Sequence, residues 1–229
     1  MMTGGVHAAV RVKEDRWLSL TRWDEDMTKA DSDLIALAKE TIIAEAKAVR
    51  AVADQMGPAV VAAARIMLRC RGHVLVAGAG TSRAVAQRFA HLLACCGTPA
   101  LFISAPDALH GGAGAVTAND VVYIISKGGR SAEINRFAEI ARDRGAKVIV
   151  HTEAPDSPLG RLGDAVCCIR APADVDPYGM IATGSSLVNS AACDALCILL
   201  LKLRGYTKQQ FGRTHPGGAV GQKIKRGGK

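Results

Sequence analysis

The sequence predicts an α/β fold, a three-layer α/β/α sandwich around a five-stranded parallel sheet. Short runs of aliphatic or β-branched residues alternate with stretches of helical periodicity, which is the pattern of βαβ units. The runs VLVA, VVYIIS and VIVH are apolar throughout, as strands covered on both faces are. With 229 residues, 49% of them hydrophobic, the chain can bury one sizeable core, so we expect a single domain.

Two helices are expected ahead of the sheet. Asp31 or Ser32 is placed to cap the first helix, which has apolar residues at helical spacing and runs to about Met56. The dipeptide Gly57-Pro58 breaks this helix, and a second helix follows to about Arg71.

Strands and helices then alternate along the chain. The five strands are expected to begin at His73, Pro99, Val121, Lys147 and Ala165. Helical patterns lie at residues 82–96 and 131–144, whereas the connections at 104–120 and 152–164 are less regular. A long helix from about Ser185 to Arg204 follows the last strand and closes the domain.

The net charge of +8 comes from the end of the chain. From Lys202 to Lys229 there are eight Lys or Arg and no Asp or Glu, so residues 1–201 carry 21 charges of each sign. This excess indicates either a solvated basic tail or a source of positive potential near an anion site. Because only 4% of the residues are aromatic and no basic excess lies outside the tail, nucleic-acid binding is not expected.

Other features of the sequence predict a soluble cytoplasmic protein with no membrane association. The seven cysteines are an odd number, form no CxxC motif and lie mostly in apolar runs, so we expect reduced, buried thiols and no metal site. Residues 1–30 show no signal peptide and predict a loose leader, and the single domain with its basic tail is expected over residues 31–229. The most apolar run, Ala195–Leu201, is too short to span a bilayer.

Two loops rich in glycine and hydroxyl groups follow predicted strands. They are GAGTS at residues 78–82, after the first strand, and SKGGRS at residues 126–131, after the third. Ligands of open α/β sheets bind beyond the carboxyl ends of the strands. Glycines let the backbone approach an oxyanion, hydroxyls donate to it, and a helix amino end adds a favourable dipole. We therefore expect a phosphate group to bind at these loops.

A dinucleotide fits these loops less well than a compact phosphate does. The dinucleotide-binding pattern needs a third glycine where this chain has Arg83, and an acidic residue at the end of the second strand, which here is Ser104. A tight turn without any ligand is a further alternative. Two Ser/Gly loops at neighbouring strand ends favour a single compact phosphate.

Five segments, in this order, resemble the sugar isomerase (SIS) domain family. They are GAGTS at 78–82, ALHG at 108–111, SKGGRSAE at 126–133, Asp176-Pro177 with Thr183 and Ser185, and THPGGAVG at 214–221. More narrowly, residues from about 35 to 225 look like the D-arabinose 5-phosphate isomerases. The CBS modules that often follow the domain in that family are absent from this sequence, so we expect no regulation through them.

This resemblance implies reversible aldose–ketose isomerisation of a phosphosugar through an enediol, by a homotetramer with no metal or nucleotide cofactor. Such chemistry needs a group that moves a proton between C1 and C2 and a group that opens the sugar ring. The resemblance implies catalytic roles for Glu133, His215, Asp174 and His110. Asp174 stands where the family has Glu, and Gly112 replaces the acidic residue after the histidine of the HG turn.

Further residues are expected to bind the sugar or its phosphate. They are Gly80, Thr81, Ser82, Ser126, Gly129, Ser131, Thr183 and Ser185. Thr81 stands where the family has Lys, which can stabilise the negative charge of an enediolate. The sequence therefore predicts poor activity on arabinose 5-phosphate, with either another preferred phosphosugar or binding alone.

Each candidate residue also has a structural alternative. Glu133 is placed to complement a helix dipole, His215 to anchor a loop, and His110 to bridge backbone groups, while the serines are placed to cap helices. The whole chain likewise has an alternative function, as a phosphosugar-binding sensor or regulatory module that acts through a protein partner. Glu133 and His215 favour the enzyme, whereas Thr81 favours the sensor.

Overall fold

The computed structural model contains the five-stranded parallel sheet that the sequence predicts. It describes residues 29–226, so most of the predicted leader lies outside the described residues. Residues up to Ile42 and residues from Ile43 onward form separate compact units. Helix α1 (Lys29–Ala51) begins in the first unit and ends in the second, and the sheet belongs wholly to the second.

All five predicted strands are confirmed. They are β1 (Val74–Gly78), β2 (Ala100–Phe102), β3 (Val121–Ile125), β4 (Lys147–Thr152) and β5 (Ala165–Cys168). The strands pair in parallel in the order β2-β1-β3-β4-β5. The chain builds the sheet outward from β1 first on one side and then on the other, so the strand order reverses between β1 and β3. Open α/β sheets bind ligands at this switch point, beyond the carboxyl ends of the strands.

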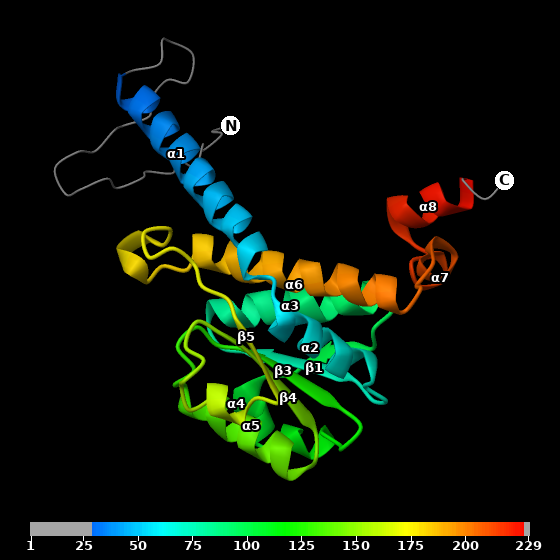
Figure 1. Cartoon of the computed structure of the whole chain (residues 1–229). Coiled ribbons are helices and arrows are strands. Elements are labelled where there is room, and N and C mark those ends of the chain that lie inside the picture. Colours follow the sequence, from blue (N-terminus) through cyan, green and yellow to red (C-terminus); the bar gives the residue numbers. More distant parts are fainter. Residues whose placement is uncertain (1–28, 227–229) are drawn as a thin grey trace, which may run out of the picture. The chain divides into compact units, whose positions relative to one another are not determined.

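Helices cover both faces of the sheet (Figure 1). One face carries α2 (Pro58–Leu68), α3 (Thr81–Cys95) and α6 (Gly184–Leu203). The other face carries α4 (Ala105–Leu109) and α5 (Ala132–Asp143). Alternate strand residues serve the two faces: in β1, Val76 packs with the first group of helices and Ala77 with the second. These two apolar clusters explain why the strand sequences are hydrophobic throughout.

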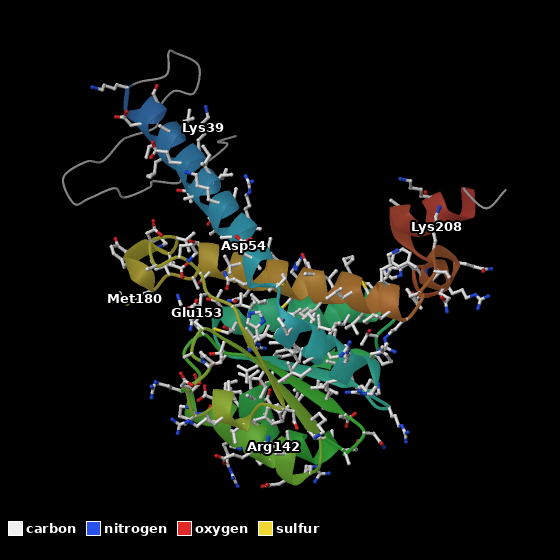
Figure 2. All side chains as sticks on the ribbon, in the orientation of Figure 1. Lys39, Asp54, Arg142, Glu153, Met180 and Lys208 are labelled. Carbon is white, nitrogen blue, oxygen red and sulfur yellow. The ribbon has the colours of Figure 1, made fainter. Side chains whose placement is uncertain are left out.

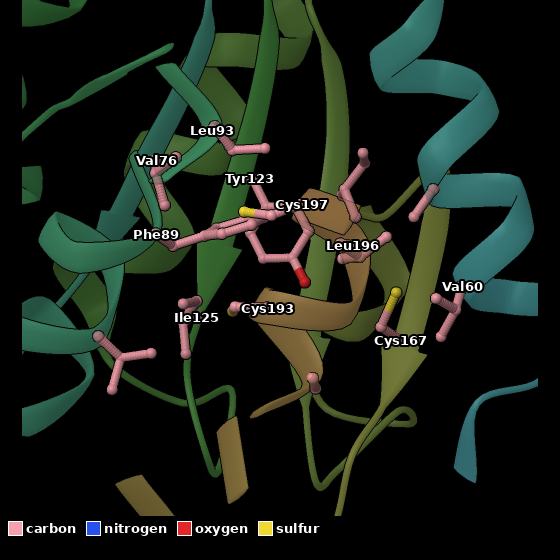
Figure 3. Close-up of a cluster of buried hydrophobic side chains, with 14 of the residues drawn as sticks. Val60, Val76, Phe89, Leu93, Tyr123, Ile125, Cys167, Cys193, Leu196 and Cys197 are labelled. Carbon is pink, nitrogen blue, oxygen red and sulfur yellow. The ribbon is translucent and has the colours of Figure 1, made fainter. Parts of the chain in front are cut away.

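The core beneath α3 and α6 contains a tyrosine. The Tyr123 side chain is fully buried, and its ring meets that of Phe89 edge to face with the centroids 4.9 Å apart. Figure 3 shows this ring among Leu196, Cys193 and Cys197 of α6, with its hydroxyl at the far end. A phenol hydroxyl in such surroundings needs a hydrogen-bonding partner, which β4 supplies.

The structure differs from the expected elements at both ends. Helix α1 already begins at Lys29, so Asp31 lies in its first turn, where it complements the helix dipole instead of capping the helix. Two helices that were not predicted follow α6, namely α7 (Lys208–Thr214) and α8 (Gly218–Arg226) (Figure 1). Thr207 and Gln210 form a capping box that starts α7. The connections between the main elements contain short 3₁₀ turns at Ala53–Gln55, Gly112–Ala115, Gly160–Leu162 and Pro177–Gly179.

The seven cysteines are all free thiols, and three of them, Cys167, Cys193 and Cys197, are buried. Burial raises the pKa of each of these three, which keeps them protonated and unreactive. Helix α6 is long and apolar enough to cross a membrane by length and composition alone. Nine of its residues are buried within the protein, as in a core helix.

Candidate functional site

A cavity of about 160 Å³ lies at the switch point of the sheet. Its walls come from the loop after β1, the start of α3, the loop after β3 and the start of α6. The lining residues are Ala79, Thr81, Ser82, Val85, Lys127, Ala182, Ser185, Ser186 and Asn189. The structure therefore brings Thr81, Ser82 and Ser185 of the predicted binding residues into one cavity, at the amino ends of two helices.

The loop after β1 needs its glycines. Gly80 precedes α3 with φ +55°, in the left-handed region that glycine adopts without strain. A Cβ on Gly78 would lie 2.6 Å from the carbonyl oxygen of Ser82, because the loop turns tightly onto the first turn of α3. Since Gly80 has no side chain to cap the helix, the first N–H groups of α3 are left for a ligand.

Lys127 lines the cavity, although sequence reasoning did not single it out. Its Nζ lies 3.2 Å from Oδ2 of Asp176, which is buried. The other carboxylate oxygen of Asp176 accepts a hydrogen bond of 2.9 Å from the backbone N–H of Ser185. Burial by itself raises the pKa of Asp176, but the hydrogen bonds from Ser185 and Lys127 outweigh it and hold the pKa below its ordinary value. The ionised carboxylate thus joins the loop after β3 to the first turn of α6.

Arg83 does not supply positive charge to the cavity. Its guanidinium carbon lies 5.6 Å from the centroid of the Phe102 ring on β2, a cation–π contact. Lys127 is therefore the one cation among the residues that line the cavity, as far as the described part of the chain shows.

A buried set of hydrogen bonds reaches the cavity from the core. On α6, Oδ1 of Asn189 lies 2.9 Å from Nε2 of His151 on β4. The Nδ1 of His151 lies 3.0 Å from the hydroxyl of Tyr123 on β3. Tyr123 and His151 are at most 1% exposed, and Asn189 is 8% exposed. Burial lowers the pKa of His151 to about 4, against the effect of its hydrogen bond with Asn189, so the imidazole is neutral near pH 7.

The other predicted residues of the loop after β3 are outside the lining of this cavity. Ser126 is buried, and its N–H donates a 2.9 Å hydrogen bond to the carbonyl of His151. Gly129 has φ +60°, and a Cβ there would collide with the hydroxyl of Ser157. A tight turn against Ser157 therefore accounts for this glycine, whatever else it does.

Glu133 follows the same loop and lies in the first turn of α5. It is half-buried and forms no hydrogen bond or ion pair within residues 29–226. Ser131 precedes α5, and its side chain makes no capping hydrogen bond. Neither side chain is occupied by the structural role that each was given as an alternative, except that Glu133 is placed to complement the helix dipole.

His110, Asp174 and Thr183 are not brought into the cavity lining. His110 ends α4 and is exposed, and Asp174 is exposed in the connection between β5 and α6. The carbonyl of Thr183 accepts a hydrogen bond from the Ser186 hydroxyl at the start of α6. Exposed apolar side chains lie on the same connection, among them Met180, which projects into solvent (Figure 2).

His215 lies at the opposite end of α3 from the cavity. Its Nε2 is 3.4 Å from Sγ of Cys95, the last residue of α3. Its ring stacks on Phe211 with the centroids 3.8 Å apart, and its Nδ1 lies 3.0 Å from the Phe211 carbonyl. Thr81 and Cys95 are the two ends of α3, which at 1.5 Å per residue puts them about 20 Å apart. One chain thus does not bring His215 to its own cavity.

A larger cavity, of about 360 Å³, lies at the opposite edge of the sheet. Its lining includes Val121 and Lys147, at the amino ends of β3 and β4, together with Arg69 and Arg71. Ligands of open α/β sheets bind at the carboxyl ends of the strands, so the smaller cavity is the candidate site. Among residues 29–226 no three His, Cys, Asp or Glu side chains are grouped to hold a metal ion.

Comparison with known proteins agrees with this location of the site. The model of the SIS domain family matches residues 67–199. Arabinose 5-phosphate isomerase GutQ of Salmonella typhi is 31% identical over 191 residues, which cover 83% of this chain and 60% of that protein. Arabinose 5-phosphate isomerase KdsD of Shigella flexneri is 36% identical over 158 residues, which cover 69% of this chain and 48% of that protein. The chain thus spans about half to three fifths of the length of these relatives.

A solved structure shows the same fold with a ligand. An Escherichia coli CFT073 protein, crystallised in complex with arabinose 5-phosphate, superposes with a TM-score of 0.77 at 32% identity. The match covers 83% of this chain and 100% of that protein. The two proteins therefore share one fold over most of the chain described above.

Proposed function

Since this chain belongs to the SIS domain family, we propose that it is a phosphosugar isomerase that interconverts an aldose phosphate and a ketose phosphate through an enediol. The observation that carries the proposal is the cavity between β1 and β3, where hydroxyl groups, two helix amino ends and one lysine converge. This combination suits a small, doubly charged phosphate better than a dinucleotide.

The phosphate is held in this proposal by the first turns of α3 and α6. The hydroxyls of Thr81 and Ser82 donate to its oxygens, and the uncapped N–H groups of α3 add further donors. Lys127 contributes positive charge while Asp176 fixes its position. The cation that the resemblance implied at position 81 is thus supplied from the loop after β3 instead of the loop after β1.

Glu133 is the proposed general base. Its carboxylate takes the proton from the carbon beside the carbonyl and returns it to the neighbouring carbon, so the enediol forms and collapses without any net loss or gain of atoms. Lys127 is placed to stabilise the negative charge that develops on the enediolate oxygen. Because this charge comes from a different side of the cavity than the family's lysine does, we expect the preferred sugar to differ from arabinose 5-phosphate.

His215 is proposed to act in the site of a neighbouring subunit of a homo-oligomer. The support is its position, about 20 Å from its own cavity along α3. Helix α6 also exposes several large apolar side chains of the kind that oligomers bury: Leu187, Ile198, Leu199 and Leu203. The resemblance implies a homotetramer.

A phosphosugar sensor without turnover is the second candidate function. Thr81 favours it, since the lysine that the resemblance implies is absent, and so do His110 and Asp174, which lie outside the cavity lining. A screen of C4 to C7 aldose and ketose phosphates separates the two functions. We expect at least one pair to reach an aldose–ketose equilibrium mixture with the wild-type chain, whereas a sensor binds a sugar phosphate and converts none.

A further inference from the structure

We infer that Tyr123 and His151 hold the side-chain amide of Asn189 so that its nitrogen faces the cavity and donates a hydrogen bond to an oxygen of the bound phosphosugar. Asn189 is then a binding residue, and Tyr123 and His151 are positioning residues that never touch the ligand. The inference rests on the proposed function, because it adds a residue to the same site.

The helical spacing of α6 places Asn189 at the site. Ser185, Ser186 and Asn189 all line the cavity, and residues three and four apart share one face of a helix. The Asn189 side chain therefore has two neighbours, the ligand space on one side and His151 of β4 on the other. Its two amide atoms differ in chemistry, so the atom that meets His151 determines which atom is left for the ligand.

The hydrogens of the relay follow from the strengths of the available acceptors. The Tyr123 hydroxyl lies beside His151 Nδ1, at 3.0 Å, and beside the Cys167 thiol. Burial raises the pKa of Tyr123 well above its ordinary value, so the phenol keeps its hydrogen. An imidazole nitrogen is a good acceptor and a thiol sulfur is a weak one, so the phenol donates to Nδ1.

The histidine then has a single arrangement. It is neutral near pH 7 and carries one ring hydrogen, which must lie on Nε2 when Nδ1 is the acceptor. The Nε2–H donates across 2.9 Å to the Asn189 oxygen, Oδ1. The nitrogen of the Asn189 amide, with its two hydrogens, is left for the cavity.

A donor at this position suits the ligand, because the oxygens of an ionised phosphate accept hydrogen bonds and do not donate them. The opposite histidine tautomer would turn the amide over and present an oxygen to the phosphate. Tyr123 and His151 therefore set the polarity of one wall of the site from the core of the sheet. A purely stabilising network would have no need of a free amide nitrogen at the cavity.

The experiment compares Tyr123→Phe, Asn189→Ala and the double variant with the wild-type full-length chain. The first readout is the ¹⁵N spectrum of the His151 imidazole in the free protein. We expect the Nε2–H tautomer alone in the wild type and a mixture of tautomers in Tyr123→Phe. The second readout is the dissociation constant, by calorimetry, of inorganic phosphate and of each sugar phosphate in a C4 to C7 panel.

We expect Asn189→Ala to weaken the tightest sugar phosphate by about 10-fold to 100-fold, the effect of losing one hydrogen bond to a charged group. Tyr123→Phe should weaken it by a smaller factor, and the double variant no more than Asn189→Ala, because Tyr123 acts through Asn189. Thr98→Val is the matched control. It removes another buried hydroxyl, the acceptor of Arg204, at the amino edge of the sheet, and should leave the tautomer and affinity unchanged.

Should Tyr123→Phe fail to fold, Asn189→Asp makes the same test. It replaces the amide nitrogen by an oxygen with little change of shape, so it should weaken phosphate binding more than Asn189→Ala does. An Nδ1–H tautomer in the wild type, or an unchanged affinity in both Asn189 variants, overturns the inference.

The outcomes for the inference and for the proposed function are distinguishable. Isomerisation by a protein whose affinity is indifferent to Asn189 removes the inference and leaves the proposed function. Affinity that depends on Asn189, without any isomerisation, does the reverse. A wild-type chain that binds neither phosphate nor any sugar phosphate of the panel overturns both.

Discussion

The Nζ of Lys127 lies 3.2 Å from Oδ2 of Asp176, and this ion pair joins two segments that are 49 residues apart in the sequence. The aspartate side chain is 2% exposed, whereas that of the lysine is 43% exposed and lines the cavity. A buried anion thus holds a cation at the edge of the space where the phosphosugar is proposed to bind.

Lys127→Met should lower the affinity for sugar phosphates by about 10-fold, because it removes the charge that faces the phosphate. Calorimetry at low and high salt checks this, and the salt dependence of binding should also weaken. Lys147→Met is the matched control, since Lys147 forms a similar ion pair with Asp164, at 2.8 Å, on the opposite edge of the sheet. Equal effects of the two substitutions would contradict the assignment of Lys127.

Glu133→Gln should keep sugar-phosphate binding and lose most of the turnover, by about two to four orders of magnitude. The carboxamide keeps the shape of the side chain but cannot accept the proton. Single-turnover rates and dissociation constants separate the two effects. Glu139→Gln, on the same helix but paired with Arg136, should be fully active. Near-wild-type turnover of Glu133→Gln would remove Glu133 from the mechanism.

Mixing Glu133→Gln subunits with His215→Asn subunits should restore activity that neither variant has alone. If each site combines Glu133 of one chain with His215 of another, random exchange within a pair regenerates about a quarter of the wild-type sites. The activity of the mixture after co-refolding, with light scattering to confirm the oligomer, is the measurement. An active wild-type monomer, or no recovery on mixing, would show that His215 does not act across subunits.

The stability of the protein should fall as the pH is lowered from about 6.5 to about 4. Burial lowers the pKa of His151 from 6.5 to about 4, so over this range the unfolded chain binds a proton that the folded chain does not. The loss is on the order of 3 kcal/mol. Urea unfolding across this range checks it, and His151→Gln should flatten the dependence. A lowered pKa also stabilises the folded state through Asp120 and Asp176, but this contribution is lost only at lower pH.

The sheet could be predicted because its strands are short apolar runs between helical patterns, and each run contributes side chains to both covering layers. The meeting of Thr81 and Ser82 with Ser185 was also within reach, since all three lie at strand ends or helix starts. Lys127 lay inside a loop that the sequence did identify, between Ser126 and Ser131. A lysine between the glycines and a strand end was a usable signal.

Other parts of the site depend on contacts that no local pattern encodes. Asp176 meets Lys127 only through the tertiary fold, since 49 residues separate them. Tyr123 and His151 lie in strands that read as uniformly buried, and their pairing with Asn189 depends on the register of β3 and β4 and on the rotation of α6. His215 lies in a recognisable motif, but its contact with Cys95 could not be predicted from spacing.

The most direct test of the account is to incubate the chain with its best sugar phosphate in deuterated water and follow the carbon beside the carbonyl by NMR. The enediol mechanism predicts that deuterium enters this carbon as aldose and ketose interconvert, since Glu133 exchanges its proton with solvent between the two transfers. The Glu133→Gln variant should bind the same sugar phosphate without incorporating deuterium. Tight binding by the wild-type chain with neither interconversion nor deuterium incorporation would contradict the proposed isomerase and identify the cavity as that of a sensor.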